Sequence, residues 1–397
     1  MTRRIAFCHF TSDTCGGSDR ALFDLVAHLD PSRFTPFLLL KAGDPMAAEY
    51  RALGAEVAEI PFVSPRRALE WRKLTAFFLW FWPHTLRAAR QFRRWNADLV
   101  HVNTSTNLQG AVAARLARRP LVWHVRELIP DSRSGALMRA MVPILATRAV
   151  AISSAVAASL ERCGARLRTV PDGIDLARYL ESERTGAVRA EFGVPDGAPL
   201  VVTVGRLEPW KGQDVLIEAA PALFAGMPEA HILIVGGAAV NKPEYAVALQ
   251  NRCRELGLEG RVRFTGVRHD IPAILADADV LVLPSVTPEP FGLTVIEAMA
   301  SARPVVATAA GGPLDTVVEG ETGRLVRPGD PNALAAAVLS VLRDPAGAAD
   351  LGEAGRRRAV ARYGIGRLVA DMAGVFEELT ARGDRDADRR ARVRDGV

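Results

Sequence analysis

Short apolar runs rich in Val, Ile, Leu and Phe recur along this chain, and segments with helical periodicity separate them. The first series covers residues 5–10, 37–40, 99–102, 121–125 and 149–152, and the second covers residues 200–204, 232–235, 262–264, 280–283 and 305–307. Short runs without alternation are typical of parallel strands that are buried on both faces. Residues 18–29, after the first run, carry apolar side chains at helical spacing, as a β-α-β unit requires. The pattern predicts an α/β fold with two doubly wound parallel sheets.

The length of the chain and the gap between the two series predict two domains. The chain has 397 residues, which is too many for one ordinary core. A turn-rich stretch begins at Pro171, so we expect an N-terminal Rossmann-like domain over 1–175 and a C-terminal Rossmann-like domain over 176–365. A helix and a charged tail are expected over 366–397. Because residues 381–397 hold six Arg and four Asp, we expect this tail to be solvated.

Composition narrows the class of protein. With 49% hydrophobic and 24% charged residues and no low-complexity block, the chain is typical of a folded globular protein. Its four cysteines include no Cys-x-x-Cys pair, which disfavours a zinc site or a disulfide framework and indicates a reducing compartment. The first residues show no signal peptide, and no segment reaches the roughly 18 apolar residues that span a bilayer. We therefore expect a cytoplasmic protein.

The loop after the apolar run 280–283 carries the strongest chemical signal. Prolines and a glycine within residues 284–292 disfavour a helix there, so a helix can begin only near Leu293. Free amides at a helix start, together with the helix dipole, bind phosphate oxygens, and α/β proteins bind nucleotides at such strand-to-helix turns. The amides expected at this position belong to Gly292, Leu293 and Thr294.

Two carboxylates and two cations accompany this predicted phosphate site. Glu297 lies one turn into the helix, ~6 Å along its axis, where it can accept hydrogen bonds from ribose hydroxyls, and Glu289 in the loop faces whatever extends beyond the phosphates. Arg206 and Lys211 follow the first strand of the second series and can grip a diphosphate between them. The alternative is a bent loop and a surface turn that carry ordinary exposed charges.

Arg206, Lys211 and the Glu-x7-Glu pair resemble the donor-site signature of the family-four retaining glycosyltransferases of the GT-B fold. Gly16-Gly-Ser-Asp-Arg20 resembles the N-terminal glycine loop of that family. Gly311-Gly312-Pro-Leu-Asp315 resembles its Gly-Gly-x-x-Glu element, with Asp where the family has Glu. The resemblance implies an α/β chain of the GT-B type, with two Rossmann-like doubly wound domains facing a central cleft. It makes 1–175 the acceptor domain and 176–365 the nucleotide-sugar donor domain.

The resemblance also assigns roles to single residues. It implies that His124, at a strand end, lies beside the transferred sugar, although a histidine there is otherwise most often structural. With Arg206, Lys211 and Glu289 it forms the expected catalytic set. On the acceptor side we expect His101, Asn103 and Glu127. The expected donor-binding residues are Gly16, Gly17, Gly205, Arg206, Lys211, Val267, Arg268, Glu289, Phe291, Gly292, Leu293, Thr294 and Glu297.

The predicted function is that of a retaining glycosyltransferase. It would move a sugar from a nucleotide-sugar donor to a glycan or lipid-linked acceptor, in cell-envelope or exopolysaccharide synthesis. We expect no cofactor besides this co-substrate and no metal, because Asp277 and Asp279 lead into a strand and the other Asp-x-Asp run lies in the tail. Two alternatives stay open: a nucleotide-sugar epimerase on the same fold, and a catalytically silent nucleotide-binding scaffold. An NAD dehydrogenase is disfavoured because the glycine loop lacks Gly-x-Gly-x-x-Gly spacing.

Residues 65–95 combine basic and aromatic side chains. They hold eight basic residues against one acid, Glu70, and four of the six tryptophans. Aromatic residues flanked by arginines are typical of segments that lie on anionic lipid. We predict peripheral attachment to the inner face of a membrane. In the alternative, the aromatics pack on the first domain and the arginines stay in water. We expect no nucleic-acid partner, because no recognition motif is present.

Overall fold

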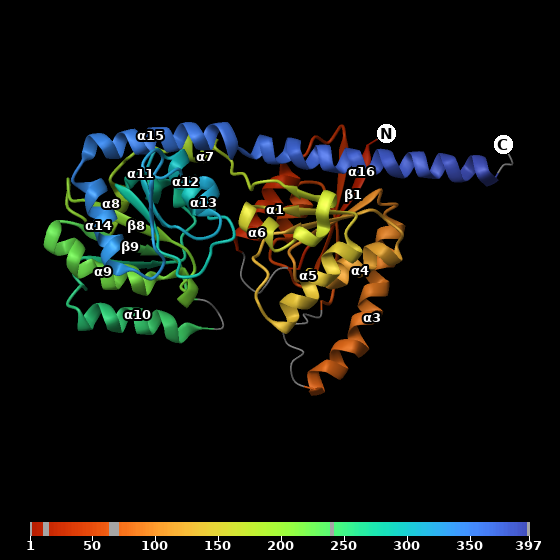
Figure 1. The fold of residues 1–397 in the computed structure, drawn as a ribbon, viewed down its shortest axis with the longest axis horizontal. Coiled ribbons are helices and arrows are strands. Elements are labelled where there is room, and N and C mark those ends of the chain that lie inside the picture. The colour runs from red at the N-terminus through yellow and green to blue at the C-terminus, as the bar shows by residue number, and fades with distance from the viewer. Residues whose placement is uncertain (1, 11–15, 63–70, 239–241, 395–397) are drawn as a thin grey trace. The chain divides into compact units, whose positions relative to one another are not determined.

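The computed structural model describes residues 2–10, 16–62, 71–238 and 242–394, with backbone alone over 71–78 and 382–394. The chain divides into two compact units, shown in Figure 1. The first unit is Met1–Asp172 with Ile365–Val397, and the second unit is Gly173–Gly364. Each unit contains one parallel sheet with helices on both faces, which confirms the predicted pair of Rossmann-like α/β folds. The C-terminal segment, which we expected as a separate part, belongs to the first unit.

In its described part, the first unit forms a seven-stranded parallel sheet in the order β3-β2-β1-β4-β5-β6-β7. Its strands are β1 (Arg3–Cys8), β2 (Phe34–Lys41), β3 (Glu56–Ile60), β4 (Leu99–Asn103), β5 (Leu121–Val125), β6 (Arg148–Ala151) and β7 (Leu167–Thr169). Its helices are α1 (Gly17–Ala27), α2 (Ala47–Ala52), α3 (Trp71–Arg94), α4 (Leu108–Leu116), α5 (Arg133–Leu145), α6 (Ser154–Ala158), the 3-10 helix η2 (Glu161–Arg166) and α16 (Ile365–Arg394).

One face of this sheet packs on α1, α2 and α16. Alternate residues of the strands, among them Ile5 and Phe7, are fully buried against these helices. The alternation follows from strand geometry, in which every second side chain points to the same face. On the opposite face α3 packs against α4. Both faces are covered, which explains why the central strands appear in the sequence as continuous apolar runs.

The helix α16 extends farther than the sequence predicted. Its apolar side chains Leu368, Met372 and Phe376 are buried in the core of the first unit. Arg148 of β6 donates to Glu378 across 2.5 Å, a contact between the sheet and this helix. The helix continues to Arg394, so most of the expected solvated tail is helical.

The helix α3 contains the described part of the basic and aromatic segment. Phe81, Phe92 and Trp95 are buried, whereas Trp80 and Trp82 are 58% and 50% exposed. Some aromatic side chains therefore pack on the first unit, as one alternative expected, and others stay exposed, as membrane attachment requires. Arg66, Arg67 and Glu70 lie outside the described residues. Among the helices described, none is both long enough and apolar enough to cross a bilayer.

The second unit, as far as it is described, forms a six-stranded parallel sheet in the order β10-β9-β8-β11-β12-β13. Its strands are β8 (Leu200–Val204), β9 (His231–Val235), β10 (Val262–Gly266), β11 (Val280–Leu283), β12 (Val305–Thr308) and β13 (Arg324–Val326). Its helices are α7 (Ala177–Leu180), α8 (Ala187–Glu191), the 3-10 helix η3 (Pro209–Lys211), α9 (Gln213–Gly226), α10 (Pro243–Glu255), α11 (Ile271–Asp277), α12 (Leu293–Ala300), α13 (Pro313–Thr316), α14 (Pro331–Leu342) and α15 (Pro345–Arg362).

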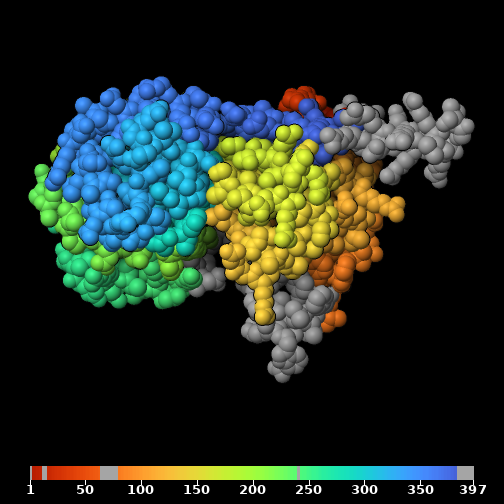
Figure 2. Space-filling model, in the orientation of Figure 1, coloured from red at the N-terminus to blue at the C-terminus, as the bar shows by residue number. Residues whose placement is uncertain are grey.

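Two cores flank the second sheet. The larger one packs α9, α10 and α14 on one face, and the smaller one packs α8 and α11 on the other. In Figure 2 the blue surface formed by α14 and α15 covers one side of this unit. The strand order reverses direction between β8 and β11, and ligands of α/β proteins bind outside the carboxyl ends of the strands at such a point. The fold therefore predicts a ligand site at the loops after β8 and β11.

Candidate functional site

The loops after β8 and β11 meet at the carboxyl edge of the second sheet. The amide of Val286 donates to the carbonyl of Trp210 across 2.9 Å, which joins the two loops directly. Gly212 makes this approach possible. A Cβ atom there would lie 2.0 Å from the carbonyl oxygen of Pro284, and the residue has a φ of +68° that favours glycine. The close approach of the two loops therefore requires a glycine directly after Lys211.

Lys211 and Glu289 form an ion pair where these loops meet. The Lys211 ammonium lies 2.7 Å from one carboxylate oxygen of Glu289, and the hydroxyl of Ser285 donates to the other oxygen across 2.8 Å. Both side chains are largely buried, at 18% and 7% exposure. The ammonium also lies 4.2 Å from the centre of the Trp210 ring. A buried cation and anion held this firmly can orient a polar ligand without moving.

Arg206 differs from Lys211 in exposure. Its side chain is 47% exposed, and one nitrogen lies 3.5 Å from a carboxylate oxygen of Glu208. Its backbone is fixed, because Gln213 donates to the Arg206 carbonyl across 2.9 Å, while Gly205 donates to Val235 across 2.9 Å. The structure therefore gives this edge one largely buried cation and one cation whose side chain extends into solvent.

The helix α12 begins at the expected position. Gly292 is its N-cap with a φ of +87°, and no side chain caps the helix. Within the described residues, the amides of Leu293 and Thr294 have no hydrogen-bond acceptor. Glu297 lies on the first turns of the same helix and is partly buried. Free amides, a dipole and the Lys211–Glu289 pair therefore come from neighbouring loops.

The two glycines Gly311 and Gly312 allow the backbone of Glu289 to approach. The amide of Gly312 donates to the carbonyl of Glu289 across 2.7 Å. A Cβ atom at Gly311 would lie 2.1 Å from the same carbonyl oxygen, so a larger residue does not fit. The Gly-Gly element thus fixes the position of Glu289. Asp315 contributes its carbonyl oxygen, which accepts from Arg358 and Tyr363.

Several expected donor-binding residues are engaged within the second unit. Phe291 is buried at 3% exposure and packs edge-on against Tyr363. Arg268 donates to Asp270 and Glu191, and these carboxylates raise the pKa of its guanidinium. Both side chains therefore support the fold of the second unit. Val267 is 69% exposed after β10.

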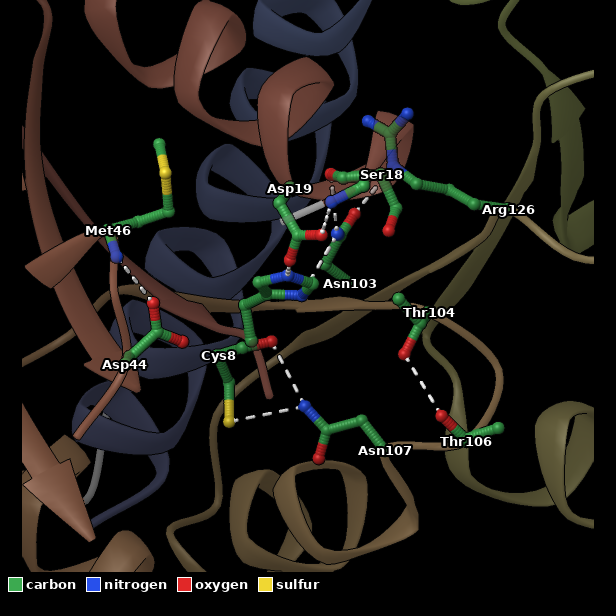
Figure 3. Close-up of polar contacts among 12 residues, drawn as sticks. Cys8, Ser18, Asp19, Asp44, Met46, Asn103, Thr104, Thr106, Asn107 and Arg126 are labelled. Atoms are coloured by element: carbon green, nitrogen blue, oxygen red, sulfur yellow. Dashed lines mark hydrogen bonds and ion pairs between the residues drawn. The ribbon is translucent and has the colours of Figure 1, made fainter. Parts of the chain in front are cut away.

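The first unit holds a buried polar network at the corresponding edge of its own sheet, where the strand order reverses between β1 and β4. Figure 3 shows part of this network. His9, after β1, lies 2.6 Å from Asp19 on α1 and 3.1 Å from the side-chain amide of Asn103 on β4. Arg126, after β5, donates to Asn103 across 2.7 Å and pairs with Asp172.

The hydrogen bonds of Asn103 determine the proton positions in the network. Its oxygen accepts from Arg126, so its nitrogen is the atom that contacts His9 Nδ1 and the carbonyl of Ser18. His9 Nδ1 must then accept, and its proton lies on Nε2, where it donates to Asp19. The amide of Asn103 is thus fully engaged with the protein, although we expected this residue on the acceptor side.

His101 and His124 form a second pair beside this network. His101 Nε2 lies 3.2 Å from His124 Nδ1, and both side chains are fully buried. Burial lowers the pKa of His101 to about 3, and the charge of Arg126 contributes. Burial and the charge of Arg126 also lower the pKa of His124 well below its usual value. Both rings are therefore neutral near pH 7. His101 packs against Phe7 and Phe376, so it supports His124 from within the core.

The remaining expected residues of the first unit, Gly16, Gly17 and Glu127, lie at the start of α1 and after β5. The amide of Gly16 donates to Asp19 across 2.6 Å, and Gly17 begins α1. Glu127 accepts from the amide of Ser105 across 2.8 Å. Sequence reasoning missed four network residues, His9, Asp19, Arg126 and Asp172. Asp19 lies within the N-terminal glycine loop that we had identified, and the strand order brings the other three residues to it. No cluster of metal-binding side chains occurs among the described residues.

Comparisons with known proteins fit this geometry. Residues 185–358 match the family described as Glycosyl transferases group 1, and residues 15–178 match the one described as Glycosyltransferase Family 4. HepE of Anabaena, solved in complex with UDP and glucose, is similar over 94% of this chain and 99% of its own, with 26% identity and a TM-score of 0.82. WaaG, a glycosyltransferase involved in lipopolysaccharide biosynthesis, shares the fold at 18% identity, covering 94% and 99% of the two chains with a TM-score of 0.70.

Two curated relatives match by sequence. A D-inositol 3-phosphate glycosyltransferase of Catenulispora acidiphila is 37% identical over 53% of this chain and 50% of its own. A GDP-mannose-dependent phosphatidylinositol monomannoside mannosyltransferase of Mycolicibacterium smegmatis is 38% identical over 49% of this chain and 52% of its own. The matches therefore span about half the length of these relatives.

Proposed function

Because the chain belongs to the family-four glycosyltransferases of the GT-B fold, we propose that it transfers a sugar from a nucleoside diphosphate donor to a hydroxyl of a glycan or lipid-linked acceptor. The observation that carries this proposal is the buried Lys211–Glu289 pair beside the uncapped start of α12. The similar HepE was solved with UDP and glucose, and one relative is GDP-mannose-dependent, which supports a nucleotide sugar as donor. A phosphatidylinositol mannoside acceptor in one relative supports a lipid-linked acceptor and a role in the cell envelope.

The chemistry proposed for this site requires stabilisation of negative charge. When the nucleoside diphosphate leaves, charge develops on phosphate oxygens, so the donors must bind the transition state more tightly than the ground state. Arg206, Lys211 and the α12 amides are suited to this task and need no metal. By analogy with a single oxyanion-hole donor, loss of one of these cations is expected to cost ~10² to 10³ in rate. We propose retention of the anomeric configuration, with a leaving-phosphate oxygen taking the acceptor proton and no covalent nucleophile.

The test is a donor screen on purified protein. Thermal shifts with UDP, GDP and ADP are compared between wild type and Glu297→Ala, with Glu353→Ala as the matched control because Glu353 is an exposed helix residue. We expect one nucleotide to stabilise wild type and the control but not Glu297→Ala. Turnover of the matching sugar, followed by NMR with a chelator present, reports metal dependence and anomeric outcome. A sugar altered without acceptor points to an epimerase, and no nucleotide response points to a silent scaffold.

We also propose that α3 attaches the protein to the cytoplasmic face of an anionic membrane. Its exposed apolar side chains, Leu79, Trp80, Trp82 and Leu86, lie on the same helix as four exposed arginines, Arg87, Arg90, Arg93 and Arg94. This helix carries no acidic residue. Aromatic side chains beside basic ones match the boundary of an anionic bilayer in both polarity and charge. Such attachment would bring the enzyme to a lipid-linked acceptor.

Liposome flotation tests this attachment. Vesicles with and without anionic lipid are mixed with wild type and with a Trp80→Ser/Trp82→Ser variant. We expect wild type to float with anionic vesicles, less so at high salt, and the variant to stay in the dense fraction. Leu137→Ser is the control, since Leu137 is an exposed leucine on α5 rather than α3. Equal flotation of wild type and the double variant rejects the role of α3.

A further inference from the structure

In the described part of the chain, two buried polar atoms at the carboxyl end of β5 lack a hydrogen-bond partner, although the rest of each side chain is engaged. His124 lies opposite Asn103 in the register of β4 and β5, and Arg126, which follows β5, donates to the same Asn103, so both groups lie beside this residue. The Arg126 side chain is 2% exposed and His124 is fully buried. Among the residues that the structure describes, neither Arg126 Nη2 nor His124 Nε2 has a hydrogen-bond partner. Leaving buried polar groups unsatisfied is costly, so two of them side by side indicate a ligand.

The remainder of the Arg126 guanidinium is held in place. Its Nε donates to Asn103 across 2.7 Å, and its Nη1 pairs with Asp172, which is also buried. Asn103 is itself fixed by His9 and by the carbonyl of Ser18. Figure 3 shows Arg126 beside Asn103 and Ser18. The free Nη2 group therefore has a set position, which lowers the entropy that binding through it costs.

The charges around Arg126 define what this group can bind. Arg126 contributes one positive charge, and Asp172 and Asp19 contribute two formal negative charges. The network thus has a formal charge of about −1, and a phosphate or carboxylate placed there would meet further negative charge. A neutral oxygen accepts from Nη2 without this repulsion.

We propose that Arg126 is a substrate-binding residue, and that its Nη2 donates to a hydroxyl oxygen of a neutral sugar or polyol ring next to His124. The inference rests on the proposed transferase function and deepens it, because it names the chemistry that the first unit recognises. Asn103 becomes a positioning residue that holds the guanidinium, not an acceptor contact. The ring belongs either to the transferred sugar or to the acceptor, which the kinetic experiment separates.

The first experiment measures ring binding directly. Saturation-transfer NMR with D-glucose, D-mannose and myo-inositol compares wild type with Arg126→Met, Arg126→Lys and the control Arg148→Met. Arg148 is also a buried arginine paired with a carboxylate, but it lies at the start of β6. We expect at least one ring to bind wild type and the control, with a roughly 10- to 100-fold weaker affinity in both Arg126 variants, the range for a lost hydrogen bond to a charged group. Lysine keeps the charge but cannot hold Asn103 and Asp172 while it donates to a ring.

Competition with inorganic phosphate tests whether the site binds a neutral ring in preference to an anion. We expect phosphate not to displace the ring from wild type. Displacement by phosphate that disappears in Arg126→Met overturns the charge argument. Ring binding of equal strength in wild type and Arg126→Met, or no ring binding to wild type, overturns the role of Arg126.

Kinetics identify the source of the ring. With UDP-glucose or GDP-mannose as donor, a raised KM for the donor in Arg126→Lys indicates the transferred sugar, and a raised KM for the acceptor indicates the acceptor. Thermal shifts with UDP and GDP report the second unit in the same proteins. No nucleotide shift in wild type means that the proposed function fails, whereas equal shifts in all variants with unchanged KM values mean that only this inference fails.

Discussion

At the residue scale, the histidine pair makes stability depend on pH. The folded state keeps His101 and His124 neutral, since the pKa of His101 is lowered to about 3 and that of His124 also falls. The unfolded chain binds protons at both sites below about pH 6.5. The unfolding free energy is therefore full above this pH and falls as the pH drops, by about 1.4 kcal/mol per histidine and pH unit. Urea unfolding between about pH 7.5 and 5.5 measures this slope. His101→Phe should reduce it by about half, and His28→Gln, on the surface, should not change it.

A single glycine sets the geometry of the donor edge. Gly212→Ala forces a Cβ atom into the Pro284 carbonyl and also places alanine at a positive φ. Gly197 has a similar φ of +78° with nothing within 4 Å of the added atom. Gly197→Ala should therefore lower the unfolding free energy only by the cost of alanine at a positive φ, about 1 to 2 kcal/mol. Gly212→Ala should lower it clearly more. Urea unfolding compares the two variants, and equal losses would show that the contact with Pro284 relaxes freely.

At the scale of elements, the sequence identified all the central strands and missed three of the four edge strands. All ten predicted runs are strands, because strands buried on both faces need continuous apolar residues. The three missed strands, β3, β7 and β13, are edge strands of their sheets. Their sequences include exposed or charged residues such as Glu56, Arg168 and Arg324, so no apolar run marks them.

The extent of α16 was missed for a related reason. Its last turns alternate Arg and Asp without an apolar stripe, which composition alone assigns to a tail. However, Asp386 and Arg390, like Asp388 and Arg392, are four residues apart, a spacing that favours helix in water. A solvated helix and an irregular solvated tail can have the same composition, and only the spacing of the charged residues distinguishes them.

The anchoring of α16 leads to a prediction at this scale. Phe376 is fully buried and contacts Phe7, Phe34 and His101. Phe376→Ala should lower the unfolding free energy by about 3 to 5 kcal/mol, as for other large core residues. Glu377→Ala removes the exposed ion pair with Arg33 and should cost far less, because solvent screens exposed ion pairs. Urea unfolding of both variants checks the contrast, and a small loss in Phe376→Ala would mean that α16 is only loosely attached.

At the scale of the whole molecule, the motifs that lie close in sequence were easier to predict than the contacts between distant segments. Lys211 and Glu289 belong to recognisable loops, so both were expected at one site, although their ion pair was not predicted. Arg126 and Asp172 are joined only by the order of strands in the folded sheet, which the sequence does not state. The polar network of the first unit therefore needed the structure.

The two units should differ when expressed as fragments. The second unit, Gly173–Gly364, is one continuous segment with its own cores. We expect it to melt cooperatively alone and to respond to the nucleotide that stabilises the whole chain. Residues 1–172 lack α16, which covers part of the first core, so this fragment should be insoluble or bind a hydrophobic dye. A cooperative melt of residues 1–172 would contradict this expectation.

The position of α16 in the chain, after the second unit, has a consequence for folding during synthesis on the ribosome. Because α16 follows the second unit, the part of the first sheet that α16 covers stays exposed while residues 173–364 are made. At roughly 5 to 20 residues per second, this interval lasts on the order of 10 to 40 s. The second unit can fold during that time, although its synthesis starts later. We therefore expect the nascent first unit to need a chaperone until the last helix emerges and closes it.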